Sequence, residues 1–261
     1  MSEKLGDLLR SWRQRRRASQ LALALDAGIS ARHLSFVETG RAQPSRPLLL
    51  RLAEVLAVPL RERNRLLLAA GYAPVFAARS LDDPALAAAR LAVERVLAGH
   101  EPYPALAVDR HWTLVMANRA LGPMLEGVSA HLLEPPINVL RLGLHPEGLA
   151  PRILNFREWR AHLLARLQQQ LEATGDAVIA GLIEELRGYP VAVGAAPVTG
   201  EDLGGVAVPL RLRVGEAELA FISTTTVFGT PLDLTLAELA IEAFFPANAA
   251  TAQLLQRAAA R

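Results

Sequence analysis

The chain has 261 residues, of which 51% are hydrophobic, and it contains no cysteine. The lack of cysteine excludes disulfides, thiolate zinc sites and cysteine catalysis. No apolar run approaches the roughly 18 residues that a membrane span requires, and the first residues lack the apolar core of a signal peptide. We therefore expect a cytoplasmic protein with no membrane partner, built as one large domain or as two.

The positive charge is concentrated near the N-terminus. Residues 1–70 contain 13 Lys and Arg against 6 Asp and Glu, whereas the remaining residues contain 15 against 20. A basic segment joined to a mildly acidic body is typical of a protein that binds phosphate groups with one end. The alternative is that the run RQRRR, at residues 13–17, is only a solvated helix end.

The first 71 residues predict a compact all-α domain. Their apolar residues recur with helical spacing, serines that can act as N-caps precede three of the runs, and glycine or proline ends four of them. Five helices are expected, at about residues 4–16, 19–28, 30–39, 46–58 and 60–71. Residues 72–84 contain two prolines and a pair of aspartates, so they are predicted to be a linker.

Residues 85–261 predict a second domain of the α+β class. Asp83 is the expected N-cap of its first helix, and Asn118 is expected to cap the helix that follows a hairpin. The segment 131–188 is mostly helical in pattern. Five strands are expected, at about residues 105–109, 112–118, 206–214, 218–229 and in the second half of 231–247. The prediction is a five-stranded antiparallel sheet with a helical insertion after the second strand, followed by a C-terminal helix.

The stretch SQLALALDAGISARHLSFVETGRAQPS, residues 19–45, places two short helices around a tight turn, which is the arrangement of a helix-turn-helix. It resembles the Xre-type, lambda-repressor-like family, and the matching residues are Ser19, Gln20, Gly28, Ile29, Ser30, Leu34, Val37, Glu38, Gly40 and Pro44. The resemblance implies binding of double-stranded DNA, usually by a homodimer on two half-sites. A module used only for dimerisation or for antitoxin packing is the alternative.

The second helix of this motif is expected to enter the major groove and to contact base edges with its solvent face. Leu34 and Val37 are expected to pack inward. Arg32 offers the paired donors that suit guanine, and Arg41 and Arg46 are candidate phosphate contacts. The full set of candidate DNA-binding residues is Gln20, Ser30, Ala31, Arg32, Ser35, Phe36, Arg41 and Arg46.

Two further roles come with the resemblance. It implies that Gln20 contacts the phosphate backbone and supports the recognition helix, and that Arg13 and Glu38 form a structural ion pair. The role of Phe36 stays open, because its apolar ring can meet a thymine methyl group in the groove or pack against a neighbouring helix or the other subunit.

The second domain shows no catalytic or metal-binding motif. Histidines occur at positions 33, 100, 111, 131, 145 and 162, without HxH or HExxH spacing. Neither a GxSxG nucleophile elbow nor a glycine-rich phosphate loop is present in the sequence. We therefore expect neither an enzyme nor a bound metal.

The hairpin VDRHWTLVMANRAL resembles the opening of a PAS domain, with Asp109 and Asn118 carrying the match. Over nearly its full length, the chain is similar to the MmyB-like transcription regulators. The motifs that carry this second resemblance are HLSFVETGRAQPSR, LRERNRLLLAAGYAP, NVLRLGLHPEG and FGTPLDLTLAELAIEAFFPAN. It implies an Xre-type DNA-binding domain, residues 1–71, and a PAS-like ligand-binding domain, residues 85–261, of a family associated with fatty-acid-like ligands.

The composition of the second domain suits such a ligand, because it is rich in Leu, Ala and Val and poor in aromatic residues. We expect an apolar pocket in which one cation or a few donors hold the head group. The candidate ligand-binding residues are Trp112, Arg141, His145, Arg152, Asn155, Trp159 and Arg160. For each of them a surface or core role is the alternative. No cofactor is expected to be required; haem would need an axial histidine, for which His145 or His162 could serve.

These expectations combine into a regulator that binds specific DNA and responds to a small apolar ligand, as a homodimer. The helix ALAAARLAVERVL is one candidate dimer contact, and covering the core of its own domain is its alternative role. A constitutive DNA-binding protein, whose second domain only dimerises or binds a protein partner, is the first rival hypothesis. An enzyme tethered to DNA is the second.

Overall fold

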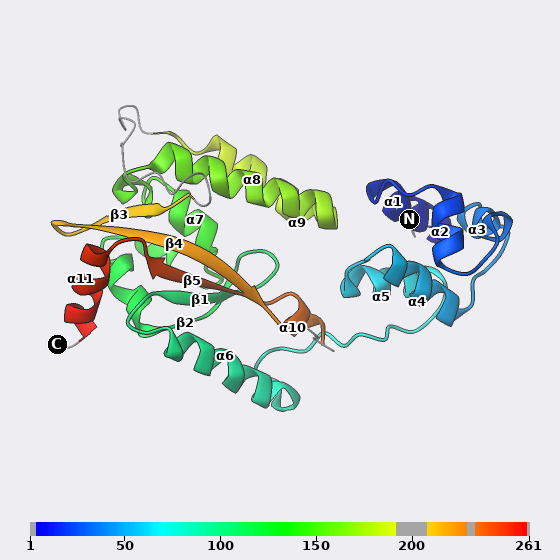
Figure 1. The fold of residues 1–261 in the computed structure, drawn as a ribbon, viewed down its shortest axis with the longest axis horizontal. Coiled ribbons are helices and arrows are strands. Elements are labelled where there is room, and N and C mark those ends of the chain that lie inside the picture. Colours follow the sequence, from blue (N-terminus) through cyan, green and yellow to red (C-terminus); the bar gives the residue numbers. More distant parts are fainter. Residues whose placement is uncertain (1–3, 192–207, 229–232, 260–261) are drawn as a thin grey trace. The chain divides into compact units, whose positions relative to one another are not determined.

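The computed structural model describes residues 4–191, 208–228 and 233–259, and its elements are labelled in Figure 1. The chain forms two compact units. The first unit consists of the chain up to Arg79 together with a short segment that ends at Ala237, and the second unit consists of the rest. Each unit has its own hydrophobic core.

The N-terminal part of the first unit is a bundle of five short helices, as predicted. They are α1 (Leu5–Arg15), α2 (Gln20–Asp26), α3 (Ala31–Glu38), α4 (Arg46–Val55) and α5 (Leu60–Ala69). The three predicted serine caps are confirmed, because the side chains of Ser19, Ser30 and Ser45 accept hydrogen bonds from the backbone N–H groups of Ala22, His33 and Leu48. These caps set where α2, α3 and α4 begin.

The turn between α2 and α3 depends on a glycine. Gly28 has a φ of 68°, in the left-handed region that glycine adopts without a steric penalty. Its N–H bonds the carbonyl of Leu25, and the next N–H, of Ile29, bonds that of Ala24. This closure ends α2 and sets the direction in which α3 leaves the turn.

A short helix from late in the sequence belongs to the first unit. Helix α10 (Leu234–Ala237) lies between two strands of the second unit in the chain but contacts α5. The N–H of Leu234 bonds the carbonyl of Ala77 at 2.9 Å, and the Thr235 hydroxyl donates to the carbonyl of Arg79. Asp233 lies 3.8 Å from the Arg79 guanidinium. The end of the first unit is therefore held by residues more than 150 positions away in the chain.

The second unit contains a five-stranded, wholly antiparallel sheet in the order β2-β1-β5-β4-β3. The strands are β1 (Ala105–Val108), β2 (Leu114–Ala117), β3 (Leu210–Val214), β4 (Ala217–Val227) and β5 (Ala240–Pro246). The turn joining β3 to β4 contains Gly215 with a φ of 57°. The predicted fold class is confirmed: a helical domain precedes an α+β domain with a helical insertion after the second strand, which fits a PAS-like architecture.

Helices cover both faces of this sheet (Figure 1). One face packs against α6 (Ala87–Gly99), through Val93 and Leu97 against Ala105 and Ala107 of β1. The other face packs against the insertion, which contains α7 (Val139–Leu144), α8 (Phe156–Thr174) and α9 (Ala177–Gly188). The remaining elements are η1 (Pro84–Leu86), η2 (Arg119–Leu125), η3 (Ala130–Leu132), η4 (Ala150–Arg152) and α11 (Ala249–Ala259).

The expected cap at Asn118 is wrong, whereas the one at Asp83 is confirmed by its bond from the Ala85 N–H. The Asn118 side chain is buried and makes no cap bond to η2. It accepts from the N–H of Ala105 and donates to the carbonyls of Leu97 and Tyr103. The amide therefore bonds three backbone groups at the junction of α6 and β1 and is not available to cap η2.

No helix in the part of the chain that the structure describes is long and apolar enough to cross a membrane.

Candidate functional site

The first candidate site is α3, the predicted recognition helix, and a buried carboxylate fixes its end. The side chain of Glu38 is fully buried. Arg13 of α1 donates to both its oxygens, Nε to Oε1 at 2.7 Å and Nη2 to Oε2 at 2.9 Å, and Gln20 of α2 donates at 2.8 Å. Burial alone raises the pKa of Glu38, but the hydrogen bonds from Arg13 and Gln20 and the charges of Arg13 and Arg10 outweigh it and hold the pKa below its ordinary value.

This network confirms the Arg13–Glu38 pair that the family resemblance implied. One carboxylate joins α1, α2 and α3, so the recognition helix cannot turn relative to the two helices behind it without breaking charge-assisted bonds. Leu34 and Val37 are fully buried on the same side, as predicted. The face opposite to these residues is free to contact a partner.

That free face carries Arg32 and Phe36, one helical turn apart. The Arg32 guanidinium lies over the Phe36 ring, 5.3 Å from its centroid, and makes no hydrogen bond or ion pair with any described residue. A ring face attracts a cation and restricts its motion. Phe36 is therefore neither in the core nor isolated, because it supports the side chain that is the leading candidate for base recognition.

The cations around α3 divide into two groups. Within the described residues, Arg32, Arg41 and Arg46 are exposed and form no hydrogen bond or ion pair, which leaves them available for phosphate or base contacts. Arg16 instead donates to the carbonyls of Leu56 and Ala57, beyond the end of α4. Of the basic run at 13–17, Arg13 and Arg16 thus have structural roles. The candidate DNA-binding assignments of Gln20, Ser30, Ala31, Arg32, Ser35, Phe36, Arg41 and Arg46 stay predictions.

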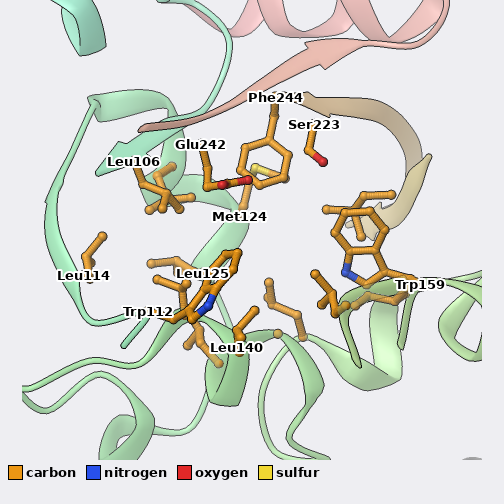
Figure 2. Close-up of a pocket in the computed structure, with 18 of the residues that line it drawn as sticks. Leu106, Trp112, Leu114, Met124, Leu125, Leu140, Trp159, Ser223, Glu242 and Phe244 are labelled. Carbon is orange, nitrogen blue, oxygen red and sulfur yellow. The ribbon is translucent and has the colours of Figure 1, made fainter. Parts of the chain in front are cut away.

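The second candidate site is a pocket of about 90 Å³ in the second unit, between the sheet and the helical insertion (Figure 2). Leucine, isoleucine, valine and methionine side chains form most of its wall. The lining residues are Leu106, Trp112, Leu114, Leu121, Met124, Leu125, Val139, Leu140, Leu142, Gly143, Leu149, Ile153, Trp159, Leu163, Arg166, Leu210, Ser223, Glu242 and Phe244. Such a wall suits an apolar ligand held by a few polar contacts.

The charged residues among those that line the pocket are Arg166 of α8 and Glu242 of β5, and they form an ion pair with each other. The guanidinium donates Nη2 to Oε1 at 2.6 Å and Nη1 to Oε2 at 3.1 Å, and the Thr225 hydroxyl donates to Oε1 at 2.9 Å. The carboxylate side chain is 5% exposed. The guanidinium also lies 4.5 Å from the centroid of the Trp112 ring. The pair is the polar part of an otherwise apolar wall.

Two of the predicted ligand-binding residues, Trp112 and Trp159, line this pocket. The Trp112 indole N–H donates to Gln170 at 2.9 Å, which fixes the ring as part of the wall. The structure places the other five predicted residues outside the lining, where each contacts other parts of the protein: Arg141, His145, Arg152, Asn155 and Arg160. Their assignment as ligand contacts stays a prediction.

The contacts of four of these residues connect neighbouring elements. Arg141 forms a two-bond pair with Glu185, whose carboxylate also accepts from the Tyr189 hydroxyl. Burial and this bond raise the pKa of Tyr189 to about 12. Asn155 bonds the carbonyl of Pro209 and the N–H of Arg211. Arg152 donates to the carbonyl of Met124, and Arg160 donates to the carbonyls of Leu186 and Arg187, at the end of α9.

Sequence reasoning missed Arg166, Ser223 and Glu242. Glu242 was detectable, because it is the one charged residue in the strand AIEAFFP and strand alternation places it on the same face as Phe244. Arg166 follows Trp159 by seven residues and therefore shares its helix face. Nothing in the sequence indicates that these two side chains meet, since 76 positions separate them.

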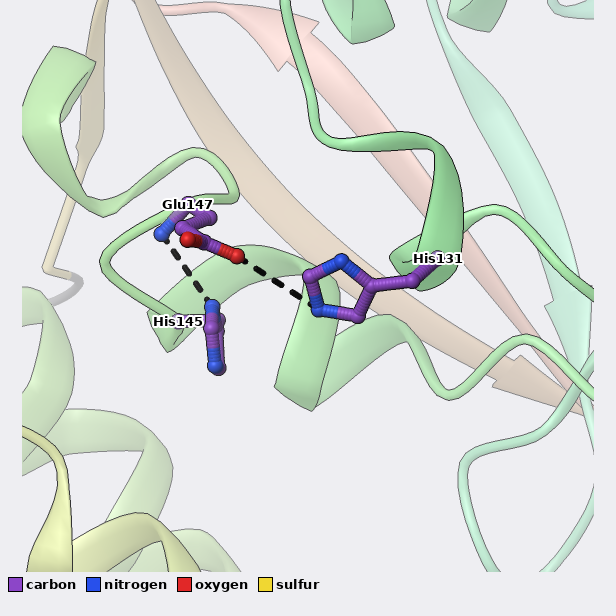
Figure 3. Close-up of side chains that lie close together, drawn as sticks. All are labelled: His131, His145 and Glu147. Atoms are coloured by element: carbon purple, nitrogen blue, oxygen red, sulfur yellow. Dashed lines mark hydrogen bonds and ion pairs between the residues drawn. The ribbon is translucent and has the colours of Figure 1, made fainter.

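Three side chains of metal-ligand type meet near the C-terminal end of α7: His131, His145 and Glu147 (Figure 3). Two imidazoles and a carboxylate are a donor set that Zn²⁺ accepts. However, Nδ1 of His145 accepts the N–H of Glu147, and Nδ1 of His131 bonds the Ser129 hydroxyl. The side chains of His131 and Glu147 are 52% and 62% exposed. The arrangement is an exposed, hydrogen-bonded cluster, and it does not test the expectation that no metal is bound.

The two candidate sites coincide with two matches to known families. Residues 4–66 match a helix-turn-helix domain. Residues 89–258, more than half of the chain and the whole of the pocket lining, match the MmyB-like transcription regulator ligand binding domain. Comparison with curated proteins finds no match. With a helix-turn-helix whose recognition helix is locked by a buried carboxylate, and a second domain that encloses an apolar pocket, the chain belongs to the MmyB-like transcription regulators.

Proposed function

We propose that the protein is a ligand-responsive, sequence-specific transcription regulator. The helix-turn-helix would bind an operator through α3, as a homodimer, and the second domain would sense a small apolar ligand. The observation that carries the proposal is the pocket of about 90 Å³ with an apolar wall and one internal ion pair. A domain that served only for dimerisation has no need of such a space, because protein interiors are otherwise close-packed.

The volume of the pocket limits the size of the ligand. At roughly 10–15 Å³ for each water-sized group, it holds about six to nine such groups. This is the size of a medium-length alkyl chain, so we propose a compact, fatty-acid-like molecule. A longer chain would require the wall to move.

The ligand would act by favouring one arrangement of the regulator. It can change DNA affinity only as far as it binds the two arrangements with different affinity. Its effect is therefore measurable as a shift in DNA affinity that saturates with ligand concentration, and DNA must change ligand affinity by the same factor.

A pair of glycine substitutions tests the proposal. Gly143 of α7 lines the pocket, Gly181 of α9 lies outside the lining, and a Cβ at either position meets nothing within 4 Å. Both positions are helical with ordinary φ, so a leucine is tolerated by the backbone at each. We expect Gly143→Leu to fill the pocket and Gly181→Leu to leave it open.

The readouts are native mass spectrometry of whatever is retained on purification, and DNA binding titrated with solvent-extracted ligand. Wild type and Gly181→Leu should retain the ligand and respond to it, whereas Gly143→Leu should do neither while melting normally. Equal retention and response in all three proteins would contradict the pocket as the sensing site. DNA binding that no retained molecule alters would favour a constitutive regulator.

A further inference from the structure

The helix η2 separates the pocket from a second, larger space. This outer groove, of about 700 Å³, lies between η2, the β3–β4 hairpin and α11, and its lining includes Ala120, Pro123, Leu219, Leu255 and Ala258. Among the described residues, Met124 of η2 is the one that lines both the pocket and the outer groove. The two spaces are therefore neighbours, and Met124 stands between them.

The 3-10 form of η2 explains this division. In a 3-10 helix, side chains three positions apart lie in the same row along the helix. Leu121 and Met124 form one such row, and both line the pocket. Ala120 and Pro123 form another row, and both line the outer groove. The wall between the two spaces is therefore, at this point, a single short helix.

The outer groove suits an alkyl chain. Its charged lining residues, Glu101 and Arg119, are both exposed, and Glu101 accepts the backbone N–H of Arg119 at 3.2 Å. Apart from these two and Gln256, the described lining consists of alanine, proline, valine, leucine and methionine. Leu254 of α11 is 40% exposed, so covering it removes apolar surface from water. The groove therefore offers an apolar surface with opposite charges only at Glu101 and Arg119.

The side chain of Met124 can move while its backbone stays in place. Arg152 donates a hydrogen bond to the Met124 carbonyl, which holds this end of η2. Met124 is 5% exposed, and Figure 2 shows its side chain among those that line the pocket. Methionine is unbranched and has three rotatable bonds, so it fills a gap in one rotamer and vacates it in another at low cost. Because Met124 lines both spaces, a change of its rotamer can join them.

We propose that the pocket and the outer groove form a single site for a long-chain apolar ligand, and that Met124 is the gate between them. Part of the chain fills the pocket, and carbons beyond about the ninth pass Met124 into the outer groove. There the chain covers Leu254 and the alanines of α11 that line the groove. This inference rests on the proposed function of the pocket, and it identifies the part of the wall that has to move for a longer chain.

The absence of cysteine from the chain makes occupation of the outer groove measurable. Ala258→Cys places a thiol in the groove, and Ala250→Cys places one on the same helix at an exposed position outside the lining. The full-length proteins are labelled with a maleimide in the presence of octanoate or hexadecanoate, each below its aggregation concentration. Hexadecanoate should slow the labelling of Ala258→Cys by at least about fivefold, because a covered thiol reacts slowly. Octanoate should leave this rate unchanged, and neither probe should affect Ala250→Cys.

Calorimetry of the same two probes with wild type gives a second measure. Hexadecanoate should bind at least about tenfold more tightly than octanoate, because its additional methylene groups leave water. A pocket that stays closed at Met124 predicts the opposite order, since the longer chain does not fit into about 90 Å³.

Met124→Ile tests the gate. It keeps an apolar side chain of similar size but adds a branch at Cβ that restricts rotation, so hexadecanoate affinity should fall by at least about tenfold. The protection of Ala258→Cys by hexadecanoate should disappear in the same background. Leu125→Ile is the matched control, because Leu125 lies on the same helix and lines the pocket but not the outer groove. It should change the affinities for the two probes by the same factor and preserve the protection.

The outcomes separate this inference from the proposed function. Hexadecanoate that binds without slowing the labelling of Ala258→Cys, or that binds more weakly than octanoate, overturns the joined site and leaves the pocket as a binding site. Protection that survives in Met124→Ile removes Met124 as the gate. Failure of both probes to bind wild type contradicts the proposed function itself, and this inference with it. If Met124→Ile does not fold, as shown by its melting curve, the labelling of Ala258→Cys in the otherwise unchanged chain decides alone.

Discussion

The protein contains two arginine–glutamate pairs of nearly the same geometry in different surroundings. In the first unit Arg13 binds Glu38, and in the second Arg166 binds Glu242, each through two charge-assisted bonds to a carboxylate that is almost fully buried. The Arg13 side chain is 13% exposed and the Arg166 side chain 27%. The second pair forms part of the wall of a cavity, whereas the first lies among packed helices.

The difference shows that the surroundings, and not the pair itself, determine its role. Around Glu38 three helix ends converge, and the pair ties them together and so fixes the position of α3. Around Glu242 the helical insertion stands off from the sheet and leaves a pocket. The same ion pair there sets the polarity that a ligand meets.

The largest expected effect tests the structural role of the first pair. Arg13→Met leaves Glu38 buried with only Gln20 and the more distant Arg10, and should destabilise the first unit by about 3 kcal/mol. Urea unfolding monitored by Trp12 fluorescence measures this change. Arg10→Met is the control: Arg10 lies 3.6 Å from Glu38 and is 43% exposed, so its loss should cost well under about 1 kcal/mol. Equal losses of stability in Arg13→Met and Arg10→Met would show that the two hydrogen bonds from Arg13 to Glu38 add nothing to stability.

The same substitution in the second pair should have a smaller effect. Arg166→Met leaves Glu242 bonded to Thr225, and solvent reaches this pair more readily, so we expect a loss of about 2 kcal/mol. Thermal melting of the full chain, with the unfolding of each unit followed separately, gives the loss of stability caused by Arg13→Met and by Arg166→Met. A loss greater than that of Arg13→Met would break the comparison, because Arg166 would then be the more important structural residue.

The third prediction concerns the surface that the first pair supports. Arg32→Ala should lower discrimination between the operator and a sequence with the contacted guanine replaced, by about 1–3 kcal/mol. Arg46→Ala should instead weaken binding to all DNA sequences alike. It should also reduce the slope of log affinity against log salt concentration by about one. Titrations at several salt concentrations distinguish the two. Identical effects of both variants on all sequences would remove Arg32 from base recognition.

Phe36 provides a finer test of the same surface. Phe36→Leu keeps an apolar side chain but removes the aromatic face under Arg32, and should reproduce part of the specificity loss of Arg32→Ala without lowering the melting temperature. Phe36→Tyr, which keeps the ring, is the matched control. A fall in melting temperature as large as that of a core substitution would assign Phe36 to packing.

The last prediction concerns the effect of acid on the first pair. The folded-state pKa of Glu38 lies below its ordinary value of 4.5, so its stabilising contribution is fully present above that value and is lost as the pH falls through the folded-state pKa. Glu38→Gln should therefore be less stable than wild type above about pH 5, and the difference should narrow in acid. Urea midpoints measured across this range provide the check. A stability difference between Glu38→Gln and wild type that does not change with pH would contradict the lowered pKa of Glu38 in the folded protein.

Local sequence patterns predicted much of the fold because each depends on neighbouring residues. The serine caps of α2, α3 and α4, the glycine turn at Gly28 and the strand alternation all act within a few positions. The same reasoning was wrong for Asn118, whose position suits a cap, because distant backbone groups compete for its side chain. It also gave no sign that α10 packs with the first unit.

The sequence by itself determined the helix-turn-helix, the order of strands and helices, and which residue types face the core, since periodicity and capping are properties of short segments. Only the tertiary structure decided which predicted cations were free. It paired Arg141 with Glu185 and left Arg32 over Phe36, and it brought Arg166 to Glu242 across 76 residues. A charge acquires its role from the partner that folding brings to it, and the partner is set by packing between elements rather than by spacing along the chain.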